Sequence, residues 1–190
     1  MYTIIAFVGK AGSGKDTLLR AVCDKFGDRV HEIVSCTTRP PREGEIDGVN
    51  YHFLTGEAFG EKVVQGEMLE ATCFNDWFYG TSFDSLNPDK VNIGVFNPAG
   101  IDSLKQHSSH IRLIVFFVNT KDKERLIRQL NRENNPDIDE IMRRYKTDMI
   151  DFEDFINEGE YLELLNNNKN DFKFNIEYLT QYIDNLAEVL

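Results

Sequence analysis

Apolar and polar residues along this chain follow two periods, and the two periods alternate. Continuous apolar runs, often β-branched, predict buried strands, and they occupy residues 2–8, 30–35, 90–96, 111–118 and 172–175. Apolar residues spaced three or four apart predict helices, at residues 15–26, 101–106, 121–132, 138–165 (broken near Glu158-Gly159) and from the last strand to the C-terminus. Strands that alternate with helices predict an α/β fold, with a mostly parallel sheet covered by helices on both faces.

One stretch interrupts this alternation. Residues 36–50 are polar and contain prolines and glycines, and short strands are predicted after them at 51–54, 68–74 and 77–81, with a helix at 57–65. Asn75-Asp76 is a turn signal. We therefore expect a core of residues 1–35 and 86–190 and an inserted β-rich lobe of residues 36–85. A chain of 190 residues fits one domain with a proper core.

The first candidate site is a glycine loop between the first strand and the first helix. It reads Gly9, Lys10, Ala11, Gly12, Ser13, Gly14, Lys15, Asp16, Thr17. Glycines let backbone N–H groups converge on phosphate oxygens, and the helix N-terminus adds a favourable dipole. The loop matches G-x-x-x-x-G-K-[ST] except that Asp16 takes the last position, with Thr17 one residue late. This pattern predicts an ATP site in which Lys15 reaches the β- and γ-phosphates.

A second candidate anion site is the dense polar run at residues 35–45. It contains Arg39 and Arg42 among hydroxyls, carboxylates and prolines. Guanidinium groups match phosphate oxygens in pairs. Two anion sites in one small chain indicate phosphoryl transfer between two nucleotides.

Composition narrows the class of protein. A net charge of −11 and a pI of about 4.8 argue against a general nucleic-acid binder. The three cysteines and four histidines show no metal-ligand spacing, which favours a reduced, cytoplasmic setting. The apolar N-terminal run is too short for a membrane span and has no basic leader, so neither a membrane nor a signal peptide is expected. The oligomeric state is left open.

At this point the motifs resemble those of the guanylate kinase family. The family pattern S-x-T-T-R-x-P-R-x-G-E corresponds to residues 35–45, and G-x-x-Y-x-F follows at 48–53. Glu70 and then Tyr79-Gly80-Thr81 match a second family stretch. A third is the arginine spacing of the family's lid, found as Arg128, Arg132 and Arg143. The motifs keep the family order over nearly the whole chain.

The resemblance implies a three-layer P-loop NTPase fold with a nucleoside monophosphate (NMP) lobe and a helical lid at about 132–143. It implies that Arg39, Arg42, Tyr51 and Tyr79 hold the acceptor phosphate. Glu70 would accept hydrogen bonds from guanine N1–H and the exocyclic amine, while Ser35 and Thr81 donate to O6. The catalytic set would be Lys15, Arg39, Arg128, Arg132 and Arg143. Asn175, at the end of the predicted last strand, resembles a residue on the adenine side.

The lid arginines have an ordinary alternative, since arginines on helices often cover a solvated face. Arg128 and Arg132 are four residues apart and share one helical face, and Asn134-Asn135-Pro136-Asp137 breaks the helix after them. That arrangement suits a mobile lid that brings positive charge to the transferred phosphoryl group. Arg125 and Arg144 are interpreted as solvent-facing neighbours.

Two departures from the family pattern affect metal and base recognition. Where the family has Asp-x-Asp after the third core strand, this chain has Val95 and Asn97. Val95 cannot help to order Mg²⁺ bound with ATP, and Asn97 could accept from the guanine amine only as a neutral group. Asp16 is a candidate for the missing carboxylate, directly or through a metal-bound water. Alternatively, Asp16 caps the helix or favours its dipole.

The sequence therefore predicts a nucleoside monophosphate kinase that uses ATP and Mg²⁺ to phosphorylate GMP or dGMP. One alternative is a related kinase acting on another (deoxy)nucleoside monophosphate or a ribosyl phosphate. The other is a non-catalytic binding module of the same fold. Modules of that kind typically lose the phosphate loop, which this chain keeps.

Overall fold

The computed structural model describes residues 1–42, 44–74, 76–132 and 134–187, and its main sheet has five strands. The strand order is β2-β7-β1-β8-β9, with β1 at Tyr2–Val8, β2 at Val30–Glu32, β7 at Val91–Phe96, β8 at Ile111–Asn119 and β9 at Leu162–Leu165. β2 pairs with β7 in parallel, and β8 pairs with β9 in parallel. Residues 4–8 of β1 are fully buried, as expected for a central strand of a covered sheet.

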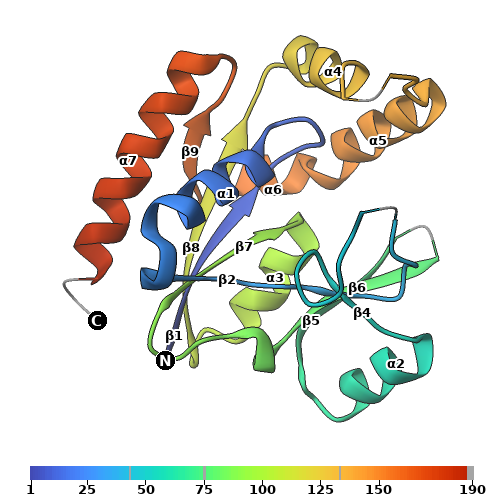
Figure 1. The fold of residues 1–190 in the computed structure, drawn as a ribbon, viewed down its shortest axis with the longest axis vertical. Coiled ribbons are helices and arrows are strands. Elements are labelled where there is room, and N and C mark those ends of the chain that lie inside the picture. The colour runs from blue at the N-terminus through green and yellow to red at the C-terminus, as the bar shows by residue number, and fades with distance from the viewer. Residues whose placement is uncertain (43, 75, 133, 188–190) are drawn as a thin grey trace. The chain divides into compact units, whose positions relative to one another are not determined.

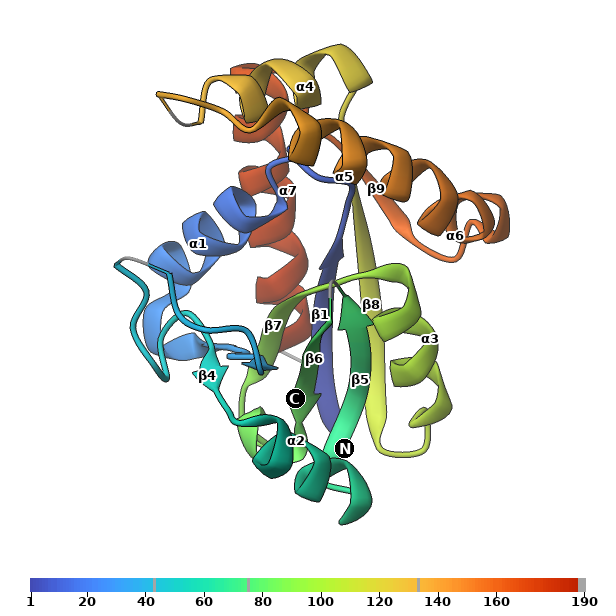
Figure 2. The ribbon, with the colours of Figure 1, turned by 90° about the vertical axis from the view of Figure 1, so that its right-hand side faces the viewer.

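A second sheet of four strands has the order β4-β3-β6-β5. Its strands are β3 at Cys36–Thr37, β4 at His52–Phe53, β5 at Met68–Phe74 and β6 at Trp77–Ser82. β5 and β6 form an antiparallel hairpin, and helix α2 at Gly56–Val64 packs against both strands (Figure 2). The Thr55 side chain caps α2 by accepting a hydrogen bond from the N–H of Ala58, as serine and threonine do at helix N-termini.

The other helices follow the strands of the main sheet in chain order. They are α1 at Lys15–Phe26, α3 at Pro98–Gln106, α4 at Asp122–Leu130, α5 at Ile138–Asp151, α6 at Glu153–Glu158 and α7 at Lys169–Ala187. Short 3₁₀ turns occupy Gly27–Arg29 and Phe83–Ser85. α7 lies beside α1 (Figure 1). In the part of the chain described above, no helix is both long and apolar enough to cross a bilayer.

The chain forms two compact units. The first contains residues 1–5, 28–94 and 99–113, and the second contains residues 6–27, 95–98 and 114–190. The expected lobe at 36–85 falls inside the first unit, whereas the glycine loop and helices α4 to α7 fall inside the second. The α/β class with a parallel sheet is confirmed, and the limits of core, lobe and lid stay predictions. Glu43 of the polar run, Asn75 of the turn and residue 133 of the lid lie outside the described residues.

Most predicted elements are present, but the C-terminal third was partly wrong. Residues 162–165, expected to continue the long helix, form β9, because their backbone pairs with residues 116–119 of β8. The predicted break is confirmed, since Gly159 ends α6 with a φ of 67°. Residues 172–175, expected as a strand, belong to α7. The buried residues Asn175, Leu179, Ile183 and Leu186 have the spacing of one helical face.

A smaller difference concerns the entry to the second sheet. The strand expected at 30–35 ends at Glu32, and Cys36–Thr37, expected in a loop, form β3. These two residues pair with Gly80 and Tyr79 of β6. A pairing over more than forty residues leaves no local signal in the sequence.

Candidate active site

In the second unit, the glycine loop adopts a backbone that requires its glycines. Gly12 and Gly14 have φ values of 78° and 90°, in the left-handed region that residues with a Cβ avoid. A Cβ on Gly12 would also lie 2.6 Å from the Arg125 carbonyl oxygen. The loop therefore packs directly against the backbone of α4, and Gly14 is the N-cap of α1.

The carbonyl groups of this loop are held by side chains from three other segments. The Ser13 oxygen accepts from Thr120 Oγ1 at 3.0 Å, Arg128 Nη1 at 3.0 Å and Asn166 Nδ2 at 2.8 Å. The Ala11 oxygen accepts from Arg125 Nη1 at 2.9 Å. In a trans peptide the C=O and the next N–H point in opposite directions. The anchored carbonyls therefore turn the N–H groups of Gly12 and Gly14 the other way, which is the arrangement an anion cradle needs.

The first turn of α1 presents a lysine and two oxygen-bearing side chains. Lys15 Nζ lies 3.6 Å from Asp16 Oδ2, and the Asp16 side chain is 69% exposed. Thr17 is also exposed. Because Gly14 is the N-cap, Asp16 is not the capping residue, and it occupies the first turn where a carboxylate favours the helix dipole. These oxygen donors fit Mg²⁺, which needs only one or two protein ligands when it is bound with nucleotide phosphates.

The three predicted lid arginines make different contacts. Arg128 donates from Nη1 to Ser13 and from Nη2 to the Asn166 carbonyl at 2.6 Å, so its side chain braces the loop. Arg132 follows α4 and is exposed. Arg143 forms two hydrogen bonds with Glu140, at 2.6 Å and 2.9 Å. The hydrogen bond from Arg143, and then that from Arg144, lower the pKa of Glu140 to about 2, so this carboxylate stays ionised.

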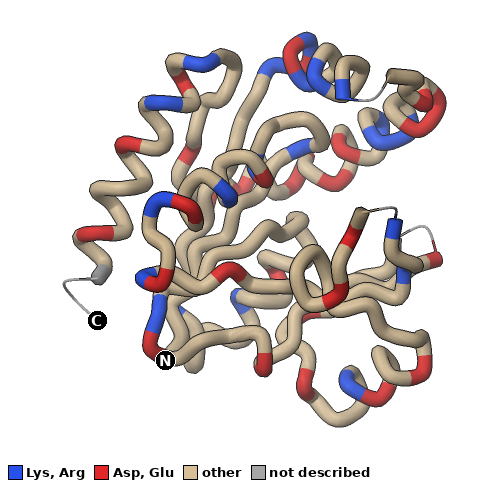
Figure 3. The backbone as a smooth tube through the Cα atoms, in the orientation of Figure 1, with Lys and Arg blue, Asp and Glu red and all other residues tan. Residues whose placement is uncertain are grey.

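The interpretation of Arg125 as solvent-facing was wrong. Its side chain is only 1% exposed, and it forms ion pairs with Asp122 and Asp148, both at 2.8 Å. Figure 3 shows acidic positions interspersed with basic ones along α4 and α5. Burial of a guanidinium group requires such partners, and one of them is 23 residues away in the sequence.

In the first unit, the structure brings together three residues that the resemblance assigned to guanine. Thr81 Oγ1 donates to Glu70 Oε1 at 2.9 Å and lies 3.5 Å from Ser35 Oγ. Thr81 is fully buried on β6 and pairs in register with Glu70 on β5, at a bulge. We call Ser35, Glu70 and Thr81 the base trio. It offers one carboxylate and two hydroxyls in one place.

The electrostatics of the base trio centre on Glu70. Burial raises the pKa of its carboxyl group to about 7, although the hydrogen bond from Thr81 acts in the opposite direction. Near neutral pH the group therefore exists in both protonation states. A partly desolvated carboxylate of this kind gains most from a ligand that supplies hydrogen-bond donors.

The residues that the resemblance assigned to the acceptor phosphate lie around Arg39. Arg39 is 9% exposed, and its Nη2 donates to both oxygens of Glu45, at 2.8 Å and 2.9 Å. Its guanidinium lies over the Tyr51 ring at 5.5 Å, and the Tyr51 ring contacts the Tyr79 ring at 6.2 Å. Arg42 is exposed, and its backbone N–H also donates to Glu45. The structure thus brings Arg39, Tyr51 and Tyr79 together.

Sequence reasoning missed the role of Glu45 in this group. Glu45 orients Arg39 and receives the Arg42 N–H, and these contacts, Arg39 first, lower the pKa of its carboxyl group. Its position at the end of the polar run was visible, but its pairing with Arg39 across two prolines was not. We call Arg39, Arg42, Glu45, Tyr51 and Tyr79 the acceptor group. Its arginine is therefore already paired with an anion, the Glu45 carboxylate.

Val95 and Asn97, which replace the family's two aspartates, lie at the end of β7 and just after it. Asn97 follows β7 in the second unit and is exposed, and Val95 is a half-buried residue near the end of the same strand. Among the described residues, no cluster of three or more His, Cys, Asp or Glu side chains could hold a metal by itself. A metal at this site would therefore need nucleotide phosphates and water as further ligands.

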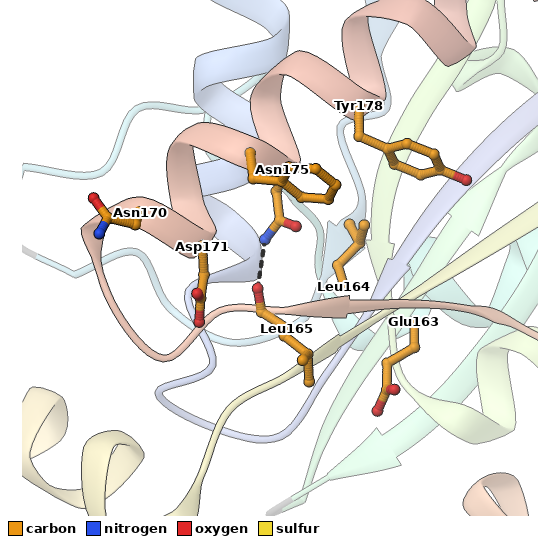
Figure 4. Close-up of a pocket in the computed structure, with 8 residues that line it drawn as sticks. Glu163, Leu164, Leu165, Asn170, Asp171, Asn175 and Tyr178 are labelled. Carbon is orange, nitrogen blue, oxygen red and sulfur yellow. Dashed lines mark hydrogen bonds between the residues drawn. The ribbon is translucent and has the colours of Figure 1, made fainter.

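The prediction for Asn175 rested on a strand that does not exist. Asn175 lies on α7, and its Nδ2 donates to the Leu165 carbonyl at 2.8 Å (Figure 4). It lines a pocket of about 600 Å³ together with Phe174, Tyr178 and residues of β9. The asparagine at the end of the last strand is Asn166, which sequence reasoning missed and which contacts the glycine loop.

Comparison with known proteins gives concordant matches. A family model described as guanylate kinase matches residues 1–185. A guanylate kinase from Campylobacter jejuni is 30% identical over 145 residues, covering 74% of this chain and 70% of that protein. A guanylate kinase from Helicobacter pylori is 32% identical over 133 residues, covering 68% and 63%. The crystal structure of guanylate kinase from Anaplasma phagocytophilum resembles the fold with a TM-score of 0.59, at 22% identity over 99% of this chain and 85% of that one.

Proposed function

Because the chain belongs to the guanylate kinase family and is a kinase, we propose that it transfers the γ-phosphoryl group of ATP to GMP or dGMP. The products would be ADP and GDP or dGDP. The observation that carries this proposal is the base trio. Guanine presents two donors, N1–H and the exocyclic amine, beside the acceptor O6. The Glu70 carboxylate would accept from both donors. The Thr81 hydroxyl, which donates to Glu70 in the structure, would turn so that it and the Ser35 hydroxyl donate to O6.

The acceptor phosphate would bind at Arg39, with Arg42, Tyr51 and Tyr79 as further donors. A phosphate resembles a carboxylate in charge and in its paired oxygens. It would therefore replace part of the contact that Arg39 makes with Glu45 at 2.8 Å. The rings of Tyr51 and Phe53, whose centroids lie 5.5 Å and 5.8 Å from the guanidinium carbon, would help to keep the guanidinium oriented during this exchange.

The donor phosphates would bind in the glycine loop of residues 9–17, with Lys15 at the β- and γ-phosphates. An oxygen of the acceptor phosphate attacks the γ-phosphorus in line, and the bond from that phosphorus to the β–γ bridging oxygen breaks. Arg39, Arg128, Arg132 and Arg143 would stabilise the negative charge that spreads over the transferred group. Asn175 stays a predicted contact on the adenine side.

Guanylate kinases generally use Mg²⁺ with ATP, and Asp16 would hold the ion directly or through a water molecule. Bound there, the ion would neutralise charge on the phosphate oxygens. Asp16 is exposed and one residue from Lys15, so a carboxylate is present where a hydroxyl is usual. Among the described residues, Cys23, Cys36 and Cys73 form no disulfide, which fits a reduced compartment such as the cytoplasm.

A second candidate substrate class follows from Asn97. Its neutral amide replaces a family carboxylate, so an acceptor with another base, or a ribosyl phosphate, is the alternative. The base trio favours guanine because Glu70 would face a ring-nitrogen or carbonyl acceptor in bases that lack the two adjacent donors.

The test is ADP formation from ATP and Mg²⁺ with a panel of acceptors. The panel contains GMP, dGMP, AMP, CMP, UMP, dTMP and a ribosyl bisphosphate, each with a no-acceptor control. We expect GMP or dGMP to have a kcat/KM at least about 100-fold above the others, since a site built to hydrogen-bond its substrate can reject analogues by about 10⁴- to 10⁵-fold. Preference for another acceptor would show that the substrate is not GMP or dGMP. Equal ADP formation with and without an acceptor would contradict phosphoryl transfer to an NMP.

A further inference from the structure

Ala11, in the middle of the glycine loop, has both of its backbone polar groups bound by one pair of charged side chains. Its N–H donates to Asp148 Oδ2 at 2.8 Å, and its C=O accepts from Arg125 Nη1 at 2.9 Å. The same Nη1 also donates to Asp148 Oδ2 at 2.8 Å. The peptide groups on both sides of Ala11 are therefore fixed by a closed ring of hydrogen bonds.

Further contacts hold the Arg125–Asp148 pair in place. Arg125 donates from Nε and Nη2 to Asp122 Oδ1, at 3.2 Å and 2.8 Å, and its guanidinium lies 5.4 Å from the centre of the Tyr145 ring. Tyr145 in turn donates to Asp122 Oδ2 at 2.8 Å. With side-chain exposures of 1% for Arg125 and 14% for Asp148, both groups are shielded from water, so these charge-assisted bonds are stronger than on an open surface.

We propose that Asp148 is a positioning residue for ATP, acting through Arg125 and the backbone of Ala11. The proposal rests on the proposed ATP-dependent function. The Ala11 carbonyl and the Gly12 N–H belong to one peptide plane, so the bond from Arg125 sets the direction of that N–H. Asp148 holds Arg125 and fixes the preceding peptide plane through the Ala11 N–H. The loop is thereby set for phosphate before the nucleotide arrives.

The closed set of hydrogen bonds among Ala11, Arg125 and Asp148 also links the loop to the helices that carry the predicted catalytic arginines. Arg125 and Arg128 are on α4, and Asp148 and Arg143 are on α5. Glu140, another carboxylate of α5, instead pairs with Arg143 and Arg144 of its own helix. Asp148 is thus a carboxylate of α5 that binds the loop backbone. Its loss would remove this contact with α5 and one of the two carboxylates that hold Arg125, while Arg128 of α4 would still donate to Ser13.

The direct test is hydrogen exchange at the Ala11 amide, measured by NMR on the protein without nucleotide. We expect the wild-type amide to be protected, and to exchange at least about tenfold faster in Asp148→Ala. Asp139→Asn is the matched control, since Asp139 is an exposed acidic residue in the first turn of α5, and it should leave this rate unchanged. Rapid exchange of Ala11 in the wild type would overturn the proposal, and this measurement does not depend on the folding of any variant.

The kinetic test separates positioning from a general structural role. Loss of a hydrogen bond to a charged group should raise the KM for ATP about 10- to 100-fold in Asp148→Ala, with the KM for GMP within about twofold of wild type. Asp148→Asn keeps an acceptor oxygen without the charge, so it should recover part of the loss. Equal increases in both KM values, or no increase for ATP, would overturn the proposal.

Failure of the proposed function would look different. If wild-type protein does not bind ATP in calorimetry, the ATP-dependent function fails, and positioning for ATP fails with it even if Ala11 is protected. If wild type binds ATP and Asp148→Ala binds it equally well while Ala11 exchanges faster, the function stands and the positioning role is overturned. If Asp148→Ala does not fold, Asp148→Asn carries the kinetic test.

Discussion

The glycine loop in the second unit and the acceptor group in the first unit differ in what their arginines orient. Next to the loop, Arg125 and Arg128 donate to backbone carbonyls of Ala11 and Ser13, and Arg125 is itself held by carboxylates. In the acceptor group, Arg39 donates to the carboxylate of Glu45 and, at 2.7 Å, to the carbonyl of its neighbour Pro40. A backbone carbonyl cannot leave without distorting the loop, whereas a carboxylate can be replaced by a phosphate of similar shape and charge.

This difference indicates whether each region is already arranged for its proposed ligand or must rearrange to bind it. The loop is fixed before binding, because its anchors are intramolecular and several of them are buried. The acceptor group carries an internal anion that keeps Arg39 oriented, and in the proposed function the acceptor phosphate would partly displace it. We infer that donor binding is limited by fit to a rigid cradle, and that acceptor binding includes an exchange of ion-pair partners. The predictions below separate the two regions by changing one at a time.

The largest effect should come from Lys15 in the loop. Lys15→Ala removes the charge proposed to reach the β- and γ-phosphates, and turnover should fall about 100- to 1000-fold, the usual cost of one preorganised transition-state contact. Lys25→Ala is the control, since Lys25 is exposed in the last turn of the same helix. A folded Lys15→Ala enzyme with near wild-type kcat would show that the loop does not bind the transferred phosphate.

The next effect concerns the base trio. Glu70→Gln keeps the size of the side chain but turns an amide donor toward guanine's two donors. The KM for GMP should rise about 10- to 100-fold, the range expected for one bidentate base contact, while the KM for ATP stays within about twofold. Glu61→Gln on α2, an exposed position, supplies the same change away from the site. If both substrates are affected equally, Glu70 does not read the base.

The raised pKa of Glu70 gives a prediction in pH. With a pKa of about 7, the carboxylate fraction is about tenfold smaller at pH 6 than at pH 8, so the KM for GMP should rise about tenfold as pH falls over that range. The stability of the fold should change in the opposite direction to GMP binding, since it should increase as pH falls. A folded-state pKa above the ordinary 4.5 gives a stabilising contribution that is complete below pH 4.5 and lost as pH rises through about 7.

The Glu70→Gln variant is the control for the pH dependence of the KM and for that of the stability. It is needed for the KM because GMP itself titrates in this range. The variant should lose the part of the KM slope that belongs to Glu70, and its melting temperature at pH 8 should equal or exceed that of wild type. A KM profile that is the same in the variant and the wild type would assign the titration to the substrate.

Local motifs and long-range contacts differ in how far the sequence could predict them. The loop and the base trio were identified because their residues lie in short motifs with fixed spacing, and β1, β5 and α1 have the expected bounds. The failures were non-local. Leu-Glu-Leu-Leu at residues 162–165 consists of good helix formers, and it forms a strand only because β8 offers a free edge.

The missed contacts have the same cause. Arg125 looks like a surface residue in the sequence, and only the fold brings Asp148 to it across 23 residues. The pairing of Arg39 with Glu45 is nearer in sequence, but two prolines between them removed any helical or strand spacing from which to predict it. The motifs were therefore recognisable in the sequence, and the groups that orient the motif residues were not.

The smallest expected effect concerns Asp16, at the boundary between loop and helix. If Asp16 helps to hold Mg²⁺ through a water molecule, Asp16→Ala should raise the Mg²⁺ concentration for half-maximal rate about three- to tenfold, since the metal keeps its phosphate and water ligands. Asp16→Ser, which restores the usual hydroxyl, should recover part of this loss. The competing explanation is a dipole effect at the start of α1, where Asp16 occupies the first turn. That effect is worth about 0.3–1 kcal/mol and would lower the melting temperature slightly without changing the Mg²⁺ dependence. Titrating Mg²⁺ at saturating ATP and GMP, beside a melting curve for each variant, separates the two roles, and an unchanged Mg²⁺ midpoint would leave Asp16 as a helix-stabilising residue only.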